Sequence, residues 1–211
     1  MQILPRVSTH AGGPTHRDAL AQRPAPADVP GCAGEPWLLP NGYLASFRPM
    51  SPASKPLIAG AMRRLSPESS RRRFLTPRFQ LSERELAHLT AVDGVRHVAY
   101  GVCGHGAGGE AEGIAAARFV RDDDDPAVAE LALTVIDEFQ RMGLGKRMLG
   151  RLAAAAWTGG VLRLRALIVP DNAPVLGLLR KYAPGARFVF DGELYVAHIP
   201  VPALARALPA A

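Results

Sequence analysis

The alternation of hydrophobic and polar residues is most regular between Ala129 and Gly150. Leu131, Leu133 and Val135 alternate with smaller or polar residues, which is typical of a strand. Beyond Gly143 the apolar residues recur at spacings of three and four, which predicts a helix. This stretch therefore predicts a strand, a glycine-containing loop and a helix in succession.

Alternation, for strands, and apolar spacings of three and four residues, for helices, also predict the rest of the fold. Helix starts are marked by Ser66 before Pro67 and by Ser82 with Glu85 three residues later. The resulting order is β, α, α, α, β, β, β, α, β, α, β, β, which predicts an α+β fold with a mixed, mostly antiparallel sheet and helices on both faces. The expected elements are strands at 43–48, 96–103, 112–120, 129–136 and 161–169, helices at 51–65, 66–74, 82–92, 144–156 and 173–182, and a hairpin at 187–190 and 194–199.

The two ends of the chain differ in composition from the middle. Residues 1–36 are rich in Gly, Pro and Ala without apolar periodicity, which predicts a disordered or loosely packed tail. We expect the folded domain at 37–200 and a C-terminal tail at 201–211. No apolar run is long enough to span a membrane, and the N-terminus lacks the pattern of a signal peptide. With two cysteines and no disulfide framework, these features predict a cytoplasmic protein.

The joint between the loop and the helix near Gly143 predicts an anion site. The first turn of a helix carries unpaired N–H groups and the positive end of the helix dipole, and glycines let an anion approach the backbone. Lys146 and Arg147 stand in this first turn, where the dipole disfavours cations unless an anion is bound. A phosphate or pyrophosphate group is the expected ligand, and the net charge of +6 on the chain suits an anionic ligand.

Three glycine motifs compete for this loop. A Walker A loop would need glycine where the chain has Gln140, and a dinucleotide fingerprint would need glycine at Met148. The pattern that fits is Gln140-x-x-Gly143-x-Gly145, which, with the strand before it, resembles the acetyl-CoA-binding motif of the GNAT N-acetyltransferases. An ordinary turn with incidental glycines is the alternative. A second glycine run at 104–109 precedes a predicted strand instead of a helix, so we interpret it as a hairpin connection.

The resemblance covers residues of about 43 to 200. The segment Leu-Ser-Pro-Glu-Ser at 65–69 is also similar to a segment of the Pat-like bacterial protein lysine acetyltransferases. The family implies acetyl-CoA as cofactor, with its pantetheine arm along the strand and near Asn172, and its pyrophosphate at the loop. The residues that the resemblance assigns to the cofactor are Leu133, Thr134, Val135, Gln140, Arg141, Met142, Gly143, Leu144, Gly145, Lys146 and Asn172.

Glu130 is the candidate general base, because a Pat-like enzyme has a glutamate at the matching position and an amine must lose a proton before it attacks. The alternative is that Glu130 only pairs with Arg118 or Arg163. The position of the tyrosine that serves many family members as general acid holds Leu179, so the general acid stays unassigned. The chemistry needs no metal, and no metal motif is present.

The run Arg71-Arg72-Arg73 leaves three interpretations open: a solvated face, contact with an acidic protein surface, or contact with nucleic acid. Nucleic acid is disfavoured because no aromatic residues are interleaved for stacking on bases. Asp137 and Glu138 are interpreted as structural or solvated.

We therefore expect an acetyl-CoA-dependent N-acetyltransferase that transfers an acetyl group directly to a primary amine in a ternary complex, with a protein lysine as the expected acceptor. Two alternatives remain. One is a non-catalytic module that senses acyl-CoA or binds a partner, and the other is an acetyltransferase for a small-molecule amine. A cationic small acceptor would favour an acidic cleft.

Overall fold

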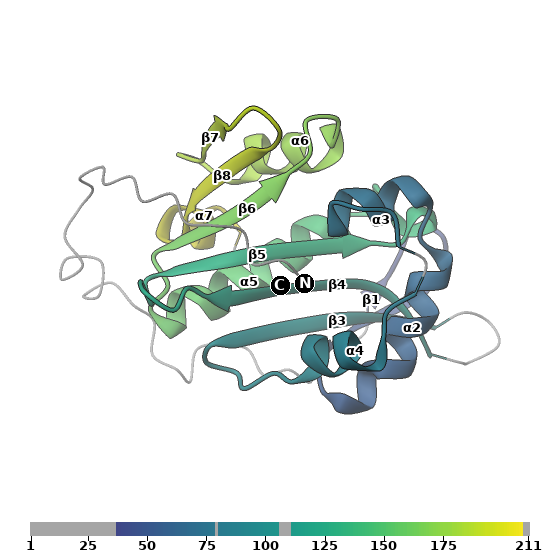
Figure 1. Cartoon of the computed structure of the whole chain (residues 1–211). Helices are drawn as coiled ribbons and strands as arrows, with labels where there is room; N and C mark the ends of the chain where they lie inside the picture. Colours follow the sequence, from purple (N-terminus) through teal and green to yellow (C-terminus); the bar gives the residue numbers. More distant parts are fainter. Residues whose placement is uncertain (1–36, 79, 106–110, 209–211) are drawn as a thin grey trace.

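A single sheet of eight strands forms the centre of the protein (Figure 1). The computed structural model describes residues 37–78, 80–105 and 111–208. Its strands are β1 (Trp37–Leu38), β2 (Leu44–Pro49), β3 (His97–His105), β4 (Ala111–Arg121), β5 (Val128–Val135), β6 (Arg163–Ile168), β7 (Arg187–Phe190) and β8 (Tyr195–Pro200). Across the sheet they follow the order β1-β2-β3-β4-β5-β6-β8-β7.

Strands β5 and β6 form the one parallel pair among the described strands; all other neighbours are antiparallel. Their register covers only Val128–Glu130 opposite Arg163–Arg165, although both strands continue further. Beyond this short ladder the two strands diverge (Figure 1). The sheet is therefore open in its middle, along the second half of β5.

Helices cover both faces of this sheet, as predicted. They are η2 (Pro52–Ser54), α2 (Lys55–Arg64), α3 (Pro67–Phe74), α4 (Glu83–Thr90), η3 (Asp137–Phe139), α5 (Leu144–Gly159), α6 (Ala173–Tyr182) and α7 (Val201–Ala207). Figure 1 shows α2, α3 and α4 in front of the sheet, with α5 and α7 behind it. Helix α5 turns Met148, Leu149 and Leu152 into the core, where each is fully buried.

Local capping explains where the front helices begin. The Ser66 hydroxyl accepts a hydrogen bond from the Ser69 N–H (3.1 Å), and Pro67 occupies the first turn of α3. Ser82 and Glu85 form the predicted capping box at the start of α4. These two predictions from the sequence are confirmed.

The predicted C-terminal tail is wrong for residues 201–207, which form helix α7. Val201, Leu204 and Leu208 are buried and belong to the core cluster that α5 also supplies. Pro202 is tolerated because the first turn of a helix needs no N–H from it. The predicted tail at 1–36 and most of the glycine run at 104–109 lie outside the described residues.

The segment after that glycine run is strand β4, antiparallel to β3, which confirms that no helix begins there. Within the part of the chain that the structure describes, no helix combines the length and apolar character that crossing a membrane requires.

Candidate functional site

The loop before α5 has the unusual backbone that its glycines predict. Gly143 is the N-cap residue of α5 with φ 84°, a left-handed conformation that favours glycine. Arg141 also has a positive φ of 62°. A Cβ atom on Gly145 would lie 3.4 Å from Cδ2 of Leu178, so α6 packs closely against this first turn of α5.

No side chain caps the N-terminus of α5. The first intrahelical bond runs from the Arg147 N–H to the Gly143 carbonyl (3.1 Å), so the N–H groups of Leu144, Gly145 and Lys146 have no acceptor within the helix. The Lys146 side chain is exposed, with its Nζ 5.2 Å from the centre of the Tyr182 ring. This helix start can hold an anion through three N–H groups and a lysine.

The second half of β5 turns backbone groups toward the opening in the sheet. The Ile136 N–H donates to the Ile114 carbonyl on the β4 side (3.0 Å), and backbone groups along a strand alternate in direction. The N–H and C=O of Leu133 and Val135 therefore point toward β6, beyond the point where pairing ends. The Val135 carbonyl accepts from Gln140 Nε2 (3.2 Å), which fixes the loop to the strand. An extended ligand with amide groups could pair with this edge as a strand does.

Helix α3 joins the ends of the two diverging strands. At its N-terminus the Ser66 N–H (3.0 Å) and the hydroxyls of Ser66 and Ser69 (both 2.7 Å) donate to the carboxylate of Asp137, which follows β5. At its other end Arg71 forms an ion pair with Asp171, which follows β6. Burial of Asp137 raises its pKa, but these hydrogen bonds outweigh burial and hold the pKa below its usual range.

These contacts give Asp137 a structural role, whereas Glu138 is 61 % exposed and pairs with Arg64 (3.0 Å) at the surface. Gln140, assigned to the cofactor by resemblance, directs its side chain inward, because its Nε2 also lies 3.2 Å from the Ser69 hydroxyl. Its backbone N–H donates to the Asp137 carbonyl (3.2 Å). Gln140 therefore shapes the loop through these contacts, and its assignment to the cofactor stays a prediction.

Asn172 lies on the β6 side of the opening as the N-cap of α6 and is 8 % exposed. Its Oδ1 accepts from the Val175 N–H (3.3 Å), which leaves the side-chain NH₂ group as its donor. About two turns further along α6, Leu179 is 2 % exposed. An aliphatic side chain in that place cannot donate a proton.

Glu130 lies on β5 at the last position that pairs with β6. Its carboxylate is 55 % exposed and has Arg165 Nη2 at 4.0 Å. The predicted alternatives were Arg118 and Arg163, and neither is within ion-pair distance of Glu130 among the described contacts. Arg118 and Arg73 nevertheless attract this carboxylate at longer range.

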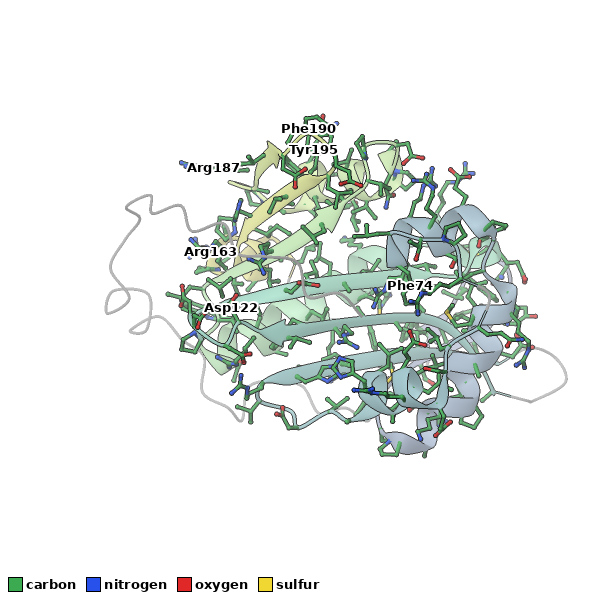
Figure 2. All side chains as sticks on the ribbon, in the orientation of Figure 1. Phe74, Asp122, Arg163, Arg187, Phe190 and Tyr195 are labelled. Carbon is green, nitrogen blue, oxygen red and sulfur yellow. The ribbon has the colours of Figure 1, made fainter. Side chains whose placement is uncertain are left out.

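An apolar cavity of about 110 Å³ lies beside Glu130, between the front face of β3–β5 and helices α2–α4. Ala132 and Thr134, on the same face of β5 as Glu130, line its floor. Phe74, at the end of α3, lies in front of the sheet and lines the cavity (Figure 2). The charged residues of its lining are Arg48, Arg73 and Arg118.

Sequence reasoning missed Arg118 and did not single out Arg73. Arg118 is a charged residue among small and apolar residues of β4, on the partly exposed face of the strand, and this is a local signal for a functional side chain. The interpretation of Arg71–Arg73 as a solvated face is wrong: Arg71 pairs with Asp171, Arg72 pairs with Glu68 and donates to the Asp171 carbonyl (3.1 Å), and Arg73 enters the cavity.

The histidines near the cavity have structural surroundings. His97 Nδ1 is 3.0 Å from the Ala91 carbonyl, and burial followed by repulsion from Arg118 lowers the pKa of both His88 and His97. Among the described residues, no group of His, Cys, Asp and Glu side chains could hold a metal ion, the acidic run at 122–125 included.

Comparisons with known proteins agree with this geometry. The model of the acetyltransferase (GNAT) family matches residues 62–183. Over 126 residues the chain is 34% identical to the acetyltransferase Pat of Mycolicibacterium smegmatis. This aligned region covers 60% of this chain and 37% of that protein.

Two solved structures are similar in fold. The GNAT domain of S. lividans PAT has a TM-score of 0.70 and 24% identity, covering 81% of this chain and 98% of that one. A variant of the cAMP-binding acyltransferase from Mycobacterium smegmatis has a TM-score of 0.54 and 28% identity, covering 82% of this chain and 48% of that one. The chain thus spans about half or less of the length of the mycobacterial proteins that it matches. Because the family model covers more than half of the chain, from α2 to the end of α6, the chain belongs to the GNAT acetyltransferase family, whose acetyl donor is acetyl-CoA.

Proposed function

We propose that this protein transfers an acetyl group from acetyl-CoA to the side-chain amine of a protein lysine, with Glu130 as the general base. The observation that carries the proposal is the position of Glu130. It stands where the β5–β6 ladder ends, on the face of β5 that borders the apolar cavity. A carboxylate there can reach an amine that enters the opening from the front face.

The cofactor occupies the opening from the other end. Its pyrophosphate accepts hydrogen bonds from the N–H groups of Leu144, Gly145 and Lys146 at the start of α5. Its pantetheine arm runs along β5, where the amides of Leu133 and Val135 face the gap, and the NH₂ group of Asn172 contacts the arm from the β6 side. This arrangement leaves the thioester between the cofactor loop and Glu130.

The transfer is a direct attack in a ternary complex. A lysine ammonium group has an unperturbed pKa of about 10.4, so Glu130 first accepts a proton from it and the neutral amine then attacks the thioester carbonyl carbon. The nitrogen releases its second proton to solvent as the amide forms. The C–S bond then breaks and the CoA thiolate leaves. Since Leu179 cannot donate, the thiolate takes its proton from solvent.

The charge of the cavity disfavours a small molecule with several positive charges more than a peptide that brings a single lysine ammonium. Arginines, and no carboxylate, are the charged residues of its described lining, so a polyamine or an aminoglycoside would meet like charge. The resemblance of the Leu65–Ser69 segment to Pat-like protein lysine acetyltransferases supports the same acceptor. The buried Leu179 favours the second candidate, a module that binds acyl-CoA without turnover.

Glu130→Gln separates these functions. We expect kcat with a lysine peptide to fall about 10²–10⁴-fold, the usual contribution of a general base, with an unchanged Kd for acetyl-CoA by calorimetry. Glu193→Gln, an exposed carboxylate in the turn before β8, is the matched control and should leave both values unchanged. A kcat for Glu130→Gln within a few-fold of wild type would remove Glu130 as the base.

A further inference from the structure

The cavity beside Glu130 is apolar except for its arginines, and two of these have no counter-ion among the residues that the structure describes. Arg118 extends from β4, and its strand partners on either side are the small residues Ala99 and Ala132, which leave room above the sheet. Its Nη1 is buried with no hydrogen-bond partner, and its Nη2 is 3.4 Å from His88 Nε2. A guanidinium has five N–H donors, and leaving one buried and unpaired costs free energy.

Arg73 approaches the same space from α3. Its guanidinium lies 4.8 Å from the centre of the Phe74 ring, and it has no ion pair among the described contacts. Burial and then repulsion from Arg118 lower the pKa of Arg73 to about 10, while Glu130 acts in the opposite direction. Burial also lowers the pKa of Arg118. Two like charges therefore share a desolvated space, and one half-exposed carboxylate partly balances them.

The contrast with the neighbouring residues of α3 is informative. Arg71 has Asp171 and Arg72 has Glu68 as ion-pair partners, so the fold supplies carboxylates to the arginines that it uses structurally. Within the described ranges it supplies none within ion-pair distance of Arg73 or Arg118. A buried cation without a partner is costly, and such groups persist where a ligand provides the opposite charge.

We propose that Arg73 and Arg118 form an anion subsite of the acceptor cavity, which holds a carboxylate carried by the acceptor close to its reactive amine. For a protein acceptor this group is an Asp or Glu side chain next to the target lysine. The inference rests on the proposed function, because it takes Glu130 as the position of the amine.

The geometry sets the spacing between the two groups of the acceptor. Arg118 is paired with Ala132 across β4 and β5, so Glu130 is its diagonal neighbour on the same face. Diagonal neighbours of this kind lie about 7–8 Å apart. A carboxylate held by Arg118 and an amine at Glu130 can therefore come from adjacent side chains of one peptide.

The test uses two peptides that differ only in one residue beside the lysine, Glu in one and Gln in the other. Binding of each to the full chain saturated with CoA is measured by calorimetry, and turnover is then measured with acetyl-CoA. We expect the Glu peptide to bind at least about tenfold more tightly, as for a charge-assisted hydrogen bond. In Arg118→Gln this preference should disappear, and in Arg118→Lys, which keeps the charge, part of it should return.

Arg187→Gln is the charge-matched control, because Arg187 is exposed on β7 at the far edge of the sheet (Figure 2). It should keep the full preference, which excludes an effect of net charge. Arg118→Gln should melt no lower than wild type, since it removes a buried unpaired charge, so loss of preference would not reflect unfolding.

Equal binding of the two peptides by wild type, or absence of binding of both, would overturn the subsite. A preference for the Glu peptide that survives in Arg118→Gln would overturn the role of Arg118. Preferential binding without acetylation would support the subsite and contradict the proposed function, so the two failures are distinguishable.

Discussion

At the scale of single residues, the three arginines at 71–73 differ although their side chains are identical. Successive residues on a helix point about 100° apart, so one run presents its charges in three directions. Arg71 and Arg72 form ion pairs with carboxylates, whereas Arg73 lines the cavity. The sequence pattern identified the run but could not assign these directions, because Asp171, which pairs with Arg71, and the strands that line the cavity at Arg73 lie far away in the chain.

Asp137 is the residue at which a pH dependence can be predicted. Asp137→Asn removes a charged acceptor of three hydrogen bonds from Ser66 and Ser69. We expect a loss of about 1 kcal/mol near neutral pH, which lowers Tm by about 2–4 °C. The folded pKa of Asp137 lies below its unfolded value of about 3.9, so this stabilisation is present above the unfolded pKa and disappears as pH falls through the folded pKa.

Thermal unfolding of wild type and Asp137→Asn across the acid range measures this difference. The two melting temperatures should converge at the lowest pH. Glu138→Gln is the neighbouring control, because its ion pair with Arg64 is exposed and contributes little. A difference between wild type and Asp137→Asn that does not change with pH would contradict the role of the Asp137 charge.

At the scale of elements, α3 connects the two strands that diverge. Its capping Ser66 was predicted from the sequence, because a helix N-cap depends on residues close in the chain. That Ser66 also binds Asp137, 71 residues away, was not predictable from local pattern. The site thus depends on a helix whose N-cap is set by residues nearby in the chain, whereas the residues that the helix contacts are far away in the chain.

The two glycines of the loop before α5 should differ on substitution. Gly143→Ala forces a Cβ into a left-handed conformation, which costs about 1–2 kcal/mol and shifts the helix start. Gly145→Ala places a Cβ at ordinary contact distance from Leu178, and alanine is favoured within a helix. We expect Gly143→Ala to melt lower and to bind acetyl-CoA at least about tenfold more weakly, a loss of about 1.4 kcal/mol, with little change for Gly145→Ala.

Calorimetry with acetyl-CoA and thermal unfolding give both quantities for each variant. If the two substitutions weakened the binding of acetyl-CoA equally, the left-handed backbone conformation of Gly143 would not be what determines binding. If neither weakened it, the loop would be an ordinary turn, which is the alternative that the sequence left open.

At the scale of the whole molecule, the C-terminal helix belongs to the domain. Leu204 of α7 is fully buried in the core cluster that α5 shares. Leu204→Ala should therefore destabilise the protein by about 2–5 kcal/mol, as for other buried leucines. Denaturant unfolding measures this loss, and exposed Arg206 on the same helix offers Arg206→Ala as a control with little effect. A Leu204→Ala variant as stable as wild type would mean that residues 201–207 do not stabilise the domain and are a tail, as the sequence predicted.

The sequence predicted the order of the main strands and helices because their apolar periods of two and 3.6 residues are clear, above all from Ala129 to Gly150. Helix α7 was missed because it is short and flanked by prolines, which usually mark loops. The loop before α5 has the predicted backbone because its glycines are a local signal. The arginine pair at the cavity could not be predicted, since it forms only when α3 packs over β4 and β5.

Mass analysis of a lysine peptide, incubated with acetyl-CoA and the full chain, decides whether this protein is an acetyltransferase for lysine. A peptide with glutamate beside the lysine should gain one acetyl group for each CoA thiol released, and Glu130→Gln should abolish most of this gain while still binding acetyl-CoA. If wild type binds acetyl-CoA but leaves the mass of every lysine peptide unchanged, transfer to protein lysine is contradicted, and a role in sensing acyl-CoA without turnover would replace it.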